Sequence, residues 1–162
     1  MSAPRAERMA RVQAAMRAAG IGGEIVQLRE NTATAARAAE VLGCAAGEIA
    51  KSLVFRRLAD DAMLVAVLSG AQRADTEKLA AAAGGKIAKA DARFVLEKSG
   101  YEIGGVPPLG HDSAVPVFVE SGMLRYEKMW AAAGSAHAVF AFAPAQLAAR
   151  ATAADFAAKS MR

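Results

Sequence analysis

The spacing of apolar residues predicts a helix at the start of the chain, followed by a short strand. Met9, Val12 and Met16 recur at intervals of three and four residues, which places them on one face of a helix over residues 4–19. A glycine-rich stretch then ends this helix. Residues 24–29, with the sequence EIVQLR, have the composition of a short strand.

The middle of the chain alternates β-rich and helical patterns. Residues 49–57 and 62–69 are two β-rich runs, and Asp60-Asp61 between them suits a hairpin turn. The other elements that we expect are, in order, a helix capped by Thr32 or Thr34 that runs to about Leu42 and ends at Gly43, a helix over 75–83, a strand over 86–89, a helix over 91–98, strands over 115–120 and 137–142, and a helix that begins after Pro144.

Two segments have weaker patterns. Residues 122–134 are ambiguous, although their composition favours a helix in which Tyr126 and Trp130, spaced i,i+4, would pack in the core or an interface. Residues 150–162 form an Ala-rich tail, which we expect to be helical and frayed. Strands and helices are mixed without regular alternation, so residues 1–162 are expected to form one α+β (mixed α/β) domain.

Composition and charge narrow the classes of partner. The chain has 162 residues, is 22% charged and 54% hydrophobic, and contains no run of about 20 apolar residues that could span a membrane. Its single cysteine, Cys44, excludes an intramolecular disulfide, so we expect a reducing, cytoplasmic environment. A net charge of +4 favours polyanionic partners such as nucleic acids.

Lys51 is the most suggestive single residue. It lies inside an apolar strand and shares one strand face with Leu53 and Phe55, while Ala50, Ser52 and Val54 share the other. A buried lysine needs a partner or a route to solvent. It is therefore either a lysine that extends its ammonium to the surface, or a point charge for a phosphate or carbonyl oxygen.

A second candidate is the segment 104–111, with the sequence GGVPPLGH. Gly104 and Gly105 allow a ligand to approach the backbone closely, and Pro107 and Pro108 stiffen the chain that follows. Such a loop can present successive N–H groups to an oxyanion, but a plain surface loop has the same composition. The segment lacks the spacing of a P-loop.

No residue pattern indicates a metal, a cofactor or a protein nucleophile. His111 and His137 are the only histidines and have no partners at metal-ligand spacing. Ser69 precedes Gly70 without the surrounding nucleophile-elbow motif, and Cys44 fits an inert, half-buried thiol. The residues alone therefore support only a basic α+β domain with a lysine and a glycine loop of interest.

Four segments in series nevertheless resemble one known family. They are Ala50-Lys51-Ser52-Leu53-Val54-Phe55, then Ser69-Gly70-Ala71-Gln72-Arg73-Ala74-Asp75, then the helix from Ala90-Asp91 to Gly100-Tyr101, and finally Gly104 to His111. In this order they resemble the YbaK/ProX family of free-standing aminoacyl-tRNA deacylases, which are related to the editing domain of bacterial prolyl-tRNA synthetases. The resemblance covers about residues 32–147.

The resemblance implies a curved, barrel-like mixed sheet flanked by helices, and hydrolysis of mischarged aminoacyl-tRNA without a metal, a cofactor or a protein nucleophile. It implies that Lys51 holds the tRNA end or orients the ester, and that the Gly104 and Gly105 amides bind the carbonyl oxygen. The expected partners are the 3′ end of tRNA and a synthetase. The other residues expected at the substrate are Ser52, Ser69, Gly70, Pro107, Pro108, Gly110, His111, Ser135 and His137.

The sequence departs from the family at two positions. Ser52 stands where some members have Asn, and Val139 stands where members resembling the cysteinyl-tRNA deacylase carry an acid, so no acidic role is transferred here. The amino acid stays open, and we expect a pocket that excludes proline but admits Ala, Ser, Thr or Cys. A tRNA- or synthetase-binding module without catalysis is the alternative, and a small-molecule hydrolase or a regulatory domain on the same scaffold is a third.

Overall fold

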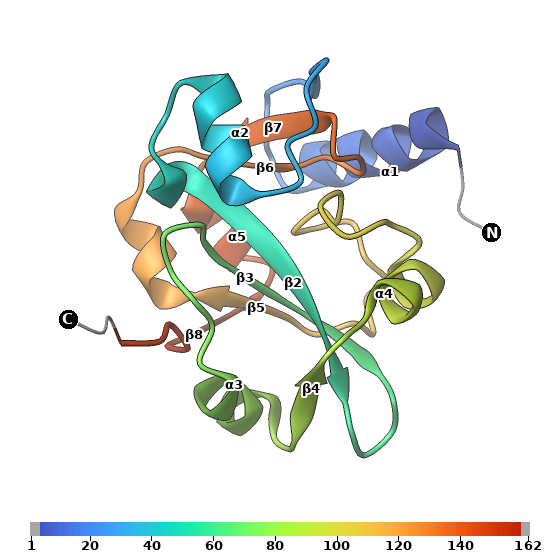
Figure 1. Cartoon of the computed structure of the whole chain (residues 1–162), viewed down its shortest axis with the longest axis vertical. Coiled ribbons are helices and arrows are strands. Elements are labelled where there is room, and N and C mark those ends of the chain that lie inside the picture. The colour runs from blue at the N-terminus through green and yellow to red at the C-terminus, as the bar shows by residue number, and fades with distance from the viewer. Residues whose placement is uncertain (1–3, 160–162) are drawn as a thin grey trace.

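The structure, a computed structural model, describes residues 4–159 (Figure 1). Its helices are α1 (Arg5–Ala18), α2 (Ala35–Leu42), α3 (Thr76–Ala83), α4 (Ala92–Ser99) and α5 (Pro144–Ala148), with 3₁₀ turns η1 (Ala46–Glu48) and η2 (Ser121–Arg125). Within this part of the chain, no helix combines the length and the apolar character needed to cross a membrane.

One mixed sheet organises the molecule. Its strands are β1 (Val26–Gln27), β2 (Ile49–Arg57), β3 (Met63–Ser69), β4 (Ile87–Lys89), β5 (Val117–Glu120), β6 (Met129–Ala132), β7 (Ala138–Phe142) and β8 (Thr152–Ala154). They lie in the order β1-β7-β6-β2-β3-β5-β8, and β4 pairs with β2. The contacts β2–β6, β3–β5 and β5–β8 are parallel. This single mixed α/β domain confirms the expected fold class.

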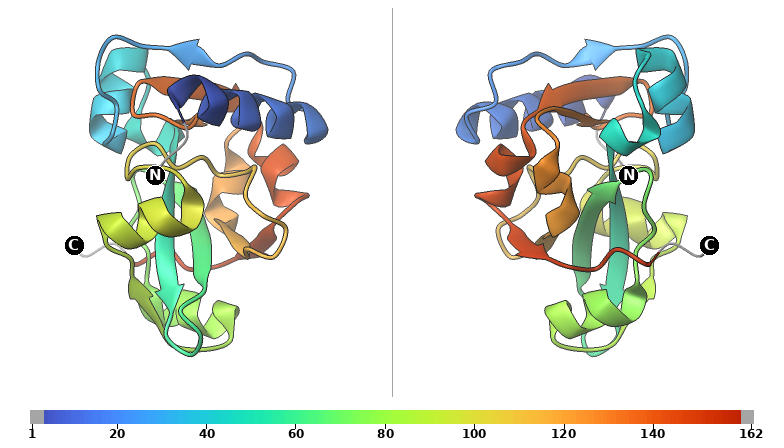
Figure 2. Two further views of the ribbon diagram at one scale, coloured as in Figure 1. Left: turned by 90° about the vertical axis from the view of Figure 1, so that its right-hand side faces the viewer. Right: turned by 90° about the vertical axis from the view of Figure 1, so that its left-hand side faces the viewer.

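The helices begin and end where the sequence predicts. Thr34 caps α2 by accepting a hydrogen bond from the Arg37 N–H (3.2 Å), and Asp75 and Asp91 cap α3 and α4 in the same way. Gly43 ends α2 in the left-handed conformation. Figure 2 shows α3 and β4 at the end of the molecule opposite to α1.

The β2–β3 hairpin is the central element, and its two faces contact different cores. The turn forms at Asp60-Asp61, where Asp61 adopts a positive φ of 58° and Arg57 pairs with Asp60. Val54 packs into the larger core, whereas Phe55 packs into a smaller cluster on the opposite face, beneath α3. The alternation predicted from the sequence is confirmed.

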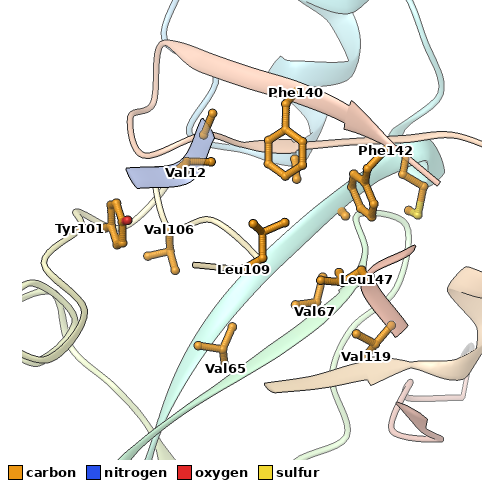
Figure 3. Close-up of a cluster of buried hydrophobic side chains, with 14 of the residues drawn as sticks. Val12, Val65, Val67, Tyr101, Val106, Leu109, Val119, Phe140, Phe142 and Leu147 are labelled. Carbon is orange, nitrogen blue, oxygen red and sulfur yellow. The ribbon is translucent and has the colours of Figure 1, made fainter. Parts of the chain in front are cut away.

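The larger core binds the glycine- and proline-rich loop to the sheet. Figure 3 shows Val106 and Leu109 of this loop among side chains from α1, the central hairpin and β7. Val12 of α1 and Phe140 of β7 are fully buried there, and both loop residues are at most 9% exposed. The loop between α4 and β5 is therefore held in place by apolar burial.

The prediction of a helix within residues 122–134 is wrong. Only η2 is helical, and Met129–Ala132 form strand β6. Burial alternates along this strand, since Met129 and Ala131 are buried and Trp130 and Ala132 are partly exposed. The alanines of this segment favour a helix, but they pair with β2 and β7 instead, because tertiary contacts outweigh intrinsic helix propensity.

The expected frayed helix at the C-terminus is also wrong for the residues described. Thr152–Ala154 add β8 in parallel to β5, and Ala157 bridges to Ala74. Phe156 is fully buried in the smaller cluster, and its N–H donates a hydrogen bond of 3.4 Å to the Glu120 carboxylate. The tail is therefore an integral part of the sheet. Residues 160–162 lie outside the described residues.

We predict that Phe156→Ala lowers the free energy of unfolding by about 3–5 kcal/mol, because it leaves a cavity in the smaller core. Denaturation in urea measures the change. Thr152→Ala, on the exposed side of β8, is the matched control and should change stability by less than about 0.5 kcal/mol. Equal stability of the two variants would contradict a docked tail.

Candidate functional site

The candidate site begins at a gap in the edge of β2. On the edge away from β3, β2 pairs with β6 at Ile49 and Ala50, and with β4 only from Phe55 onward. Residues 51–53 therefore have no neighbouring strand on this side. The Val54 carbonyl accepts the Ala90 N–H and so points to this edge. Because strand residues alternate, the N–H and C=O of Ser52 point to the gap as well.

A cavity of about 210 Å³ occupies this gap. Its lining comes from the start of β2, from α2 and the segment that leads into it, from the loop between α4 and β5, and from β6 and β7, whose arrangement Figure 1 shows. Most of the lining is apolar, and Lys51 is the one charged residue that residues 4–159 contribute to it. The lining residues are Thr32, Ala33, Thr34, Ala35, Ala38, Ile49, Ala50, Lys51, Ser52, Leu53, Ile103, Gly104, Val106, Trp130, Ala131, Ala132 and Val139.

Lys51 is half-buried and belongs to a group of cations. Burial lowers the pKa of its ammonium below the ordinary value, and the positive charges of Arg73 and Lys89 lower that pKa further. Among residues 4–159, none of these three side chains forms an ion pair within 4.0 Å. The structure therefore concentrates uncompensated positive charge beside the cavity.

Ser52 contributes an unpartnered hydroxyl. Its Oγ is buried and has no hydrogen-bond partner within the described part of the chain. A buried hydroxyl without a partner costs free energy of folding, so such groups are rare in proteins. Ser52 also lines the cavity, so a bound molecule would contact this residue.

Gly104 lies on the opposite wall of the cavity. Its φ of +89° is one that favours glycine, and a Cβ at this position would lie 2.7 Å from the Cβ of Ala33. Glycine is therefore required both by conformation and by space. No hydrogen bond from the Gly104 N–H occurs among residues 4–159.

The Gly105 amide, which was expected to bind a carbonyl oxygen of the substrate, is hydrogen-bonded within its own loop. This N–H donates a hydrogen bond of 2.9 Å to the Glu102 carbonyl, and Gly105 does not line the cavity. A Cβ on Gly105 would lie 3.0 Å from the backbone of Ser135, and the Gly105 carbonyl accepts the Gly134 N–H. Gly105 therefore joins two loops rather than facing the cavity.

The rest of the glycine- and proline-rich loop also lies away from this cavity. Pro108, Gly110 and His111 line a different hollow, between α1 and the segment before β5. The Nε2 of His111 lies 2.7 Å from the Pro107 carbonyl oxygen, and burial lowers the pKa of the imidazole. The substrate contacts expected of Pro107, Pro108, Gly110 and His111 are not supported, because none of these residues lines the cavity at β2.

Ser69 and Gly70 have structural roles at the end of β3. The Ser69 hydroxyl donates to the Gly47 carbonyl (2.8 Å), and a Cβ on Gly70 would lie 2.5 Å from the Cβ of Ala35. Neither residue lines the cavity, so the expected substrate contacts are not supported. Cys44 is half-buried, and burial raises the pKa of its thiol, as fits an inert cysteine.

Ser135 and His137 hold the loop before α2. The Ser135 Oγ accepts the His137 N–H (3.1 Å), and the His137 Nδ1 lies 3.1 Å from the Arg29 carbonyl oxygen. Thr32 donates from both its N–H and its hydroxyl to the Ala136 carbonyl. Ser135 and His137 therefore support the cavity from outside instead of lining it.

The sequence reasoning missed most of the cavity lining. Thr32 and Ala33 precede α2, Ile103 precedes Gly104, and Trp130 comes from a strand that was expected to be a helix. Of these segments, only the one before α2 could be located from the sequence, through the helix cap at Thr34. Within residues 4–159, no three His, Cys, Asp or Glu side chains lie close enough together to hold a metal ion.

We predict opposite stability effects for two serine substitutions. Ser69→Ala should lower the free energy of unfolding by about 1 kcal/mol, because it removes a made hydrogen bond. Ser52→Ala should leave it unchanged or raise it, because it removes an unpartnered buried hydroxyl. Urea denaturation of both variants measures the difference. A comparable loss for Ser52→Ala would show that its hydroxyl is satisfied within the protein.

Similar solved structures share this arrangement of elements. "A putative trans-editing enzyme for prolyl tRNA synthetase" is 35% identical, with 94% of this chain and 98% of that chain covered and a TM-score of 0.83. The hypothetical protein APE2540 is 28% identical, with 91% and 99% covered and a TM-score of 0.85. Both sequence identities are high enough for the similarity to concern the sequence as well as the fold.

Sequence comparisons agree with the structural ones. The uncharacterized protein YwhH of Bacillus subtilis is 32% identical over 124 residues, which are 76% of this chain and 78% of that protein. The model of the aminoacyl-tRNA editing domain matches residues 29–149, which include β2, the loop before α2 and the glycine loop. The chain belongs to the aminoacyl-tRNA editing domain family.

Proposed function

We propose that this protein is a free-standing deacylase that hydrolyses the ester between a small, wrong amino acid and the 3′ end of a tRNA. The observation that carries the proposal is the cavity at the gap of β2, where Lys51, Ser52 and Gly104 face a common space. Membership of the editing-domain family supports the reaction class, and the trans-editing neighbour supports action on a separate tRNA, with tRNA-Pro as the first candidate.

The reaction needs little covalent machinery. Water attacks the ester carbonyl carbon, the bond to the ribose oxygen breaks, and the ribose hydroxyl and the free amino acid leave. An aminoacyl ester is already reactive, so positioning the water and stabilising the oxyanion supply most of the acceleration. Among the described residues the Gly104 N–H makes no hydrogen bond, and the Ser52 N–H points to the gap of β2, so these two groups suit the oxyanion.

The lining favours a small aliphatic amino acid. Six alanines contribute to the walls, and Val139 keeps apolar the position at which some relatives were expected to carry an acid. A mostly apolar wall gives a polar substrate side chain few partners, which penalises serine and threonine relative to alanine. Alanine is therefore the substrate side chain that the cavity suits best.

The charge around the cavity favours a nucleic acid as the carrier of the ester. Lys51, Arg73 and Lys89 form no ion pair with an acidic residue of the described part of the chain, so they can bind backbone phosphates next to the ester. The partners that we propose are thus the acceptor end of tRNA in the cytoplasm and, transiently, the synthetase that releases the mischarged tRNA.

We predict that the purified protein releases alanine from mischarged tRNA-Pro, and that Lys51→Ala reduces kcat/KM by about 100-fold or more, because an ammonium at the ester is lost. Single-turnover deacylation with labelled alanine measures both. Lys86→Ala, which removes an exposed lysine in the turn before β4, is the control and should keep full activity. Unchanged turnover of the Lys51 variant would contradict the role given to Lys51.

The same experiment distinguishes the alternative function. A tRNA- or synthetase-binding module without catalysis would bind tRNA with a steep salt dependence but release no amino acid from Ala-, Ser-, Thr-, Cys- or Pro-charged tRNA. A small-molecule hydrolase would show no affinity for tRNA. Release of alanine in preference to the other amino acids supports the deacylase and the proposed fit of the cavity.

A pH dependence follows from the charge on Lys51. Its folded pKa is lowered, so the ammonium should be lost, and tRNA affinity should fall, at a lower pH than for an ordinary lysine. Arg73→Ala removes a like charge, raises the pKa of Lys51 and shifts this loss to higher pH. Lys51→Arg should abolish this pH-dependent loss of affinity. The measurement is fluorescence anisotropy with an uncharged acceptor-stem hairpin from about pH 7 to about pH 10. An identical pH midpoint for the loss of affinity in wild type and Arg73→Ala would refute the coupling.

A further inference from the structure

We infer that the protein forms a two-fold symmetric dimer in which strand β1 pairs with β1 of a second copy. The inference does not depend on the proposed function. Three features of the molecule support it, namely the outer edge of β1, the groove between this edge and α1, and the two opposite charges that line the groove.

The outer edge of β1 carries backbone groups that no neighbouring strand pairs. β1 is the last strand on its side of the sheet, and its one strand neighbour among residues 4–159 is β7. The Leu28 N–H donates to the His137 carbonyl (2.7 Å), so Leu28 and, by alternation, Val26 point to β7. Ile25 and Gln27 therefore point away from the sheet, and within the same residues the Ile25 backbone forms no hydrogen bond to another backbone group. Such an edge is a template for a further strand.

An open groove lies beside this edge, and its other wall is α1. The volume of the groove is about 570 Å³. Ala6, Met9 and Ala10 line it at helical spacing, and Ile25 lines it from the side of β1. Figure 2 shows that α1 and β1 lie together at one end of the molecule. The small side chains of α1 leave room for a further strand, which would cover the half-buried Met9 and Ile25.

The charges in the groove favour a second copy as the occupant. Arg5 and Glu24 are exposed and line the groove, and neither forms an ion pair within the described part of the chain. The chain reverses between α1 and β1 (Figure 2), so Arg5 lies toward the Gln27 end of β1 and Glu24 lies at the other end. Two antiparallel copies of β1 place the start of each strand beside the end of the other. Glu24 of each copy then lies at the Arg5 end of the other groove, and two ion pairs form.

The same charges favour one register of the pairing. Ile25 of one copy opposes Gln27 of the other, so the outward-pointing residues exchange N–H···O bonds. A register in which Gln27 opposes Gln27 would place Glu24 opposite Glu30, and like charges directly opposite one another are unfavourable. In the favoured register Val26 faces Val26 across the two-fold axis at a position without hydrogen bonds, where the Cα atoms of an antiparallel pair lie about 4.5 Å apart.

Oligomeric state and charge reversal test the pairing. We expect the wild-type protein to dimerise with increasing concentration between about 1 μM and about 100 μM in analytical ultracentrifugation. Arg5→Glu or Glu24→Arg alone should weaken dimerisation about tenfold or more, because each brings like charges together, and the two changes combined should restore the dissociation constant to within about threefold. Lys86→Glu makes the same change in net charge as Arg5→Glu at an exposed lysine before β4, and should leave the dimer unchanged.

Cross-linking tests the register. Val26→Cys in a Cys44→Ala background should form a disulfide-linked dimer under mild oxidation, because the two Cα atoms lie at disulfide distance. Leu124→Cys is the matched control, since Leu124 is 46% exposed, against 40% for Val26, but lies on η2 outside the groove. It should give no comparable dimer on a non-reducing gel.

Three results would overturn the inference. The first is a wild-type protein that stays monomeric over this range, as it would if the groove took a strand of a different protein. The second is a dimer that neither single charge reversal weakens. The third is a Val26→Cys variant that cross-links no faster than Leu124→Cys.

Discussion

The site depends on the interrupted edge of strand β2. A central strand normally has hydrogen-bonding neighbours along both edges, but β2 changes neighbour, from β6 at Ala50 to β4 at Phe55. Between these points the backbone of Ser52 points to open space. Buried backbone groups are rarely left without partners, so a sheet keeps such an interruption only where solvent or a ligand supplies them. The cavity lies along this interruption.

The opposite wall is made rigid by the core rather than by its own hydrogen bonds. Val106 follows Gly104 and Gly105 by one or two residues and is anchored among the buried side chains of α1, β3 and β7 (Figure 3). Gly104 itself fits against Ala33 so closely that no side chain is tolerated. The distance across the cavity is therefore set by packing, which changes little when a substrate enters. A preorganised site of this kind suits a reaction that depends on positioning.

The sequence identified the residues whose chemistry is local and missed those that tertiary pairing brings in. The β2–β3 hairpin, the caps at Thr34, Asp75 and Asp91, and the exceptional Lys51 follow from patterns within a few residues. Strand β6 could not be predicted, because its Ala-rich sequence favours a helix until β2 and β7 pair with it. Gly104 and Gly105 also look equivalent in the sequence. Only the structure shows that one faces the cavity and the other binds Glu102.

The site also carries a cost in stability that its ligand would relieve. Lys51 has a lower pKa in the folded protein than in the unfolded chain, so between these two pKa values the unfolded chain binds more protons, and stability from this group rises with pH. At neutral pH its charge therefore opposes folding, together with the unpartnered hydroxyl of Ser52. A phosphate or a developing oxyanion beside Lys51 would favour the charged form and raise that pKa. Both features that weaken the free protein would thus strengthen its complex with an anionic ligand, which is the expected signature of residues retained for binding rather than for folding.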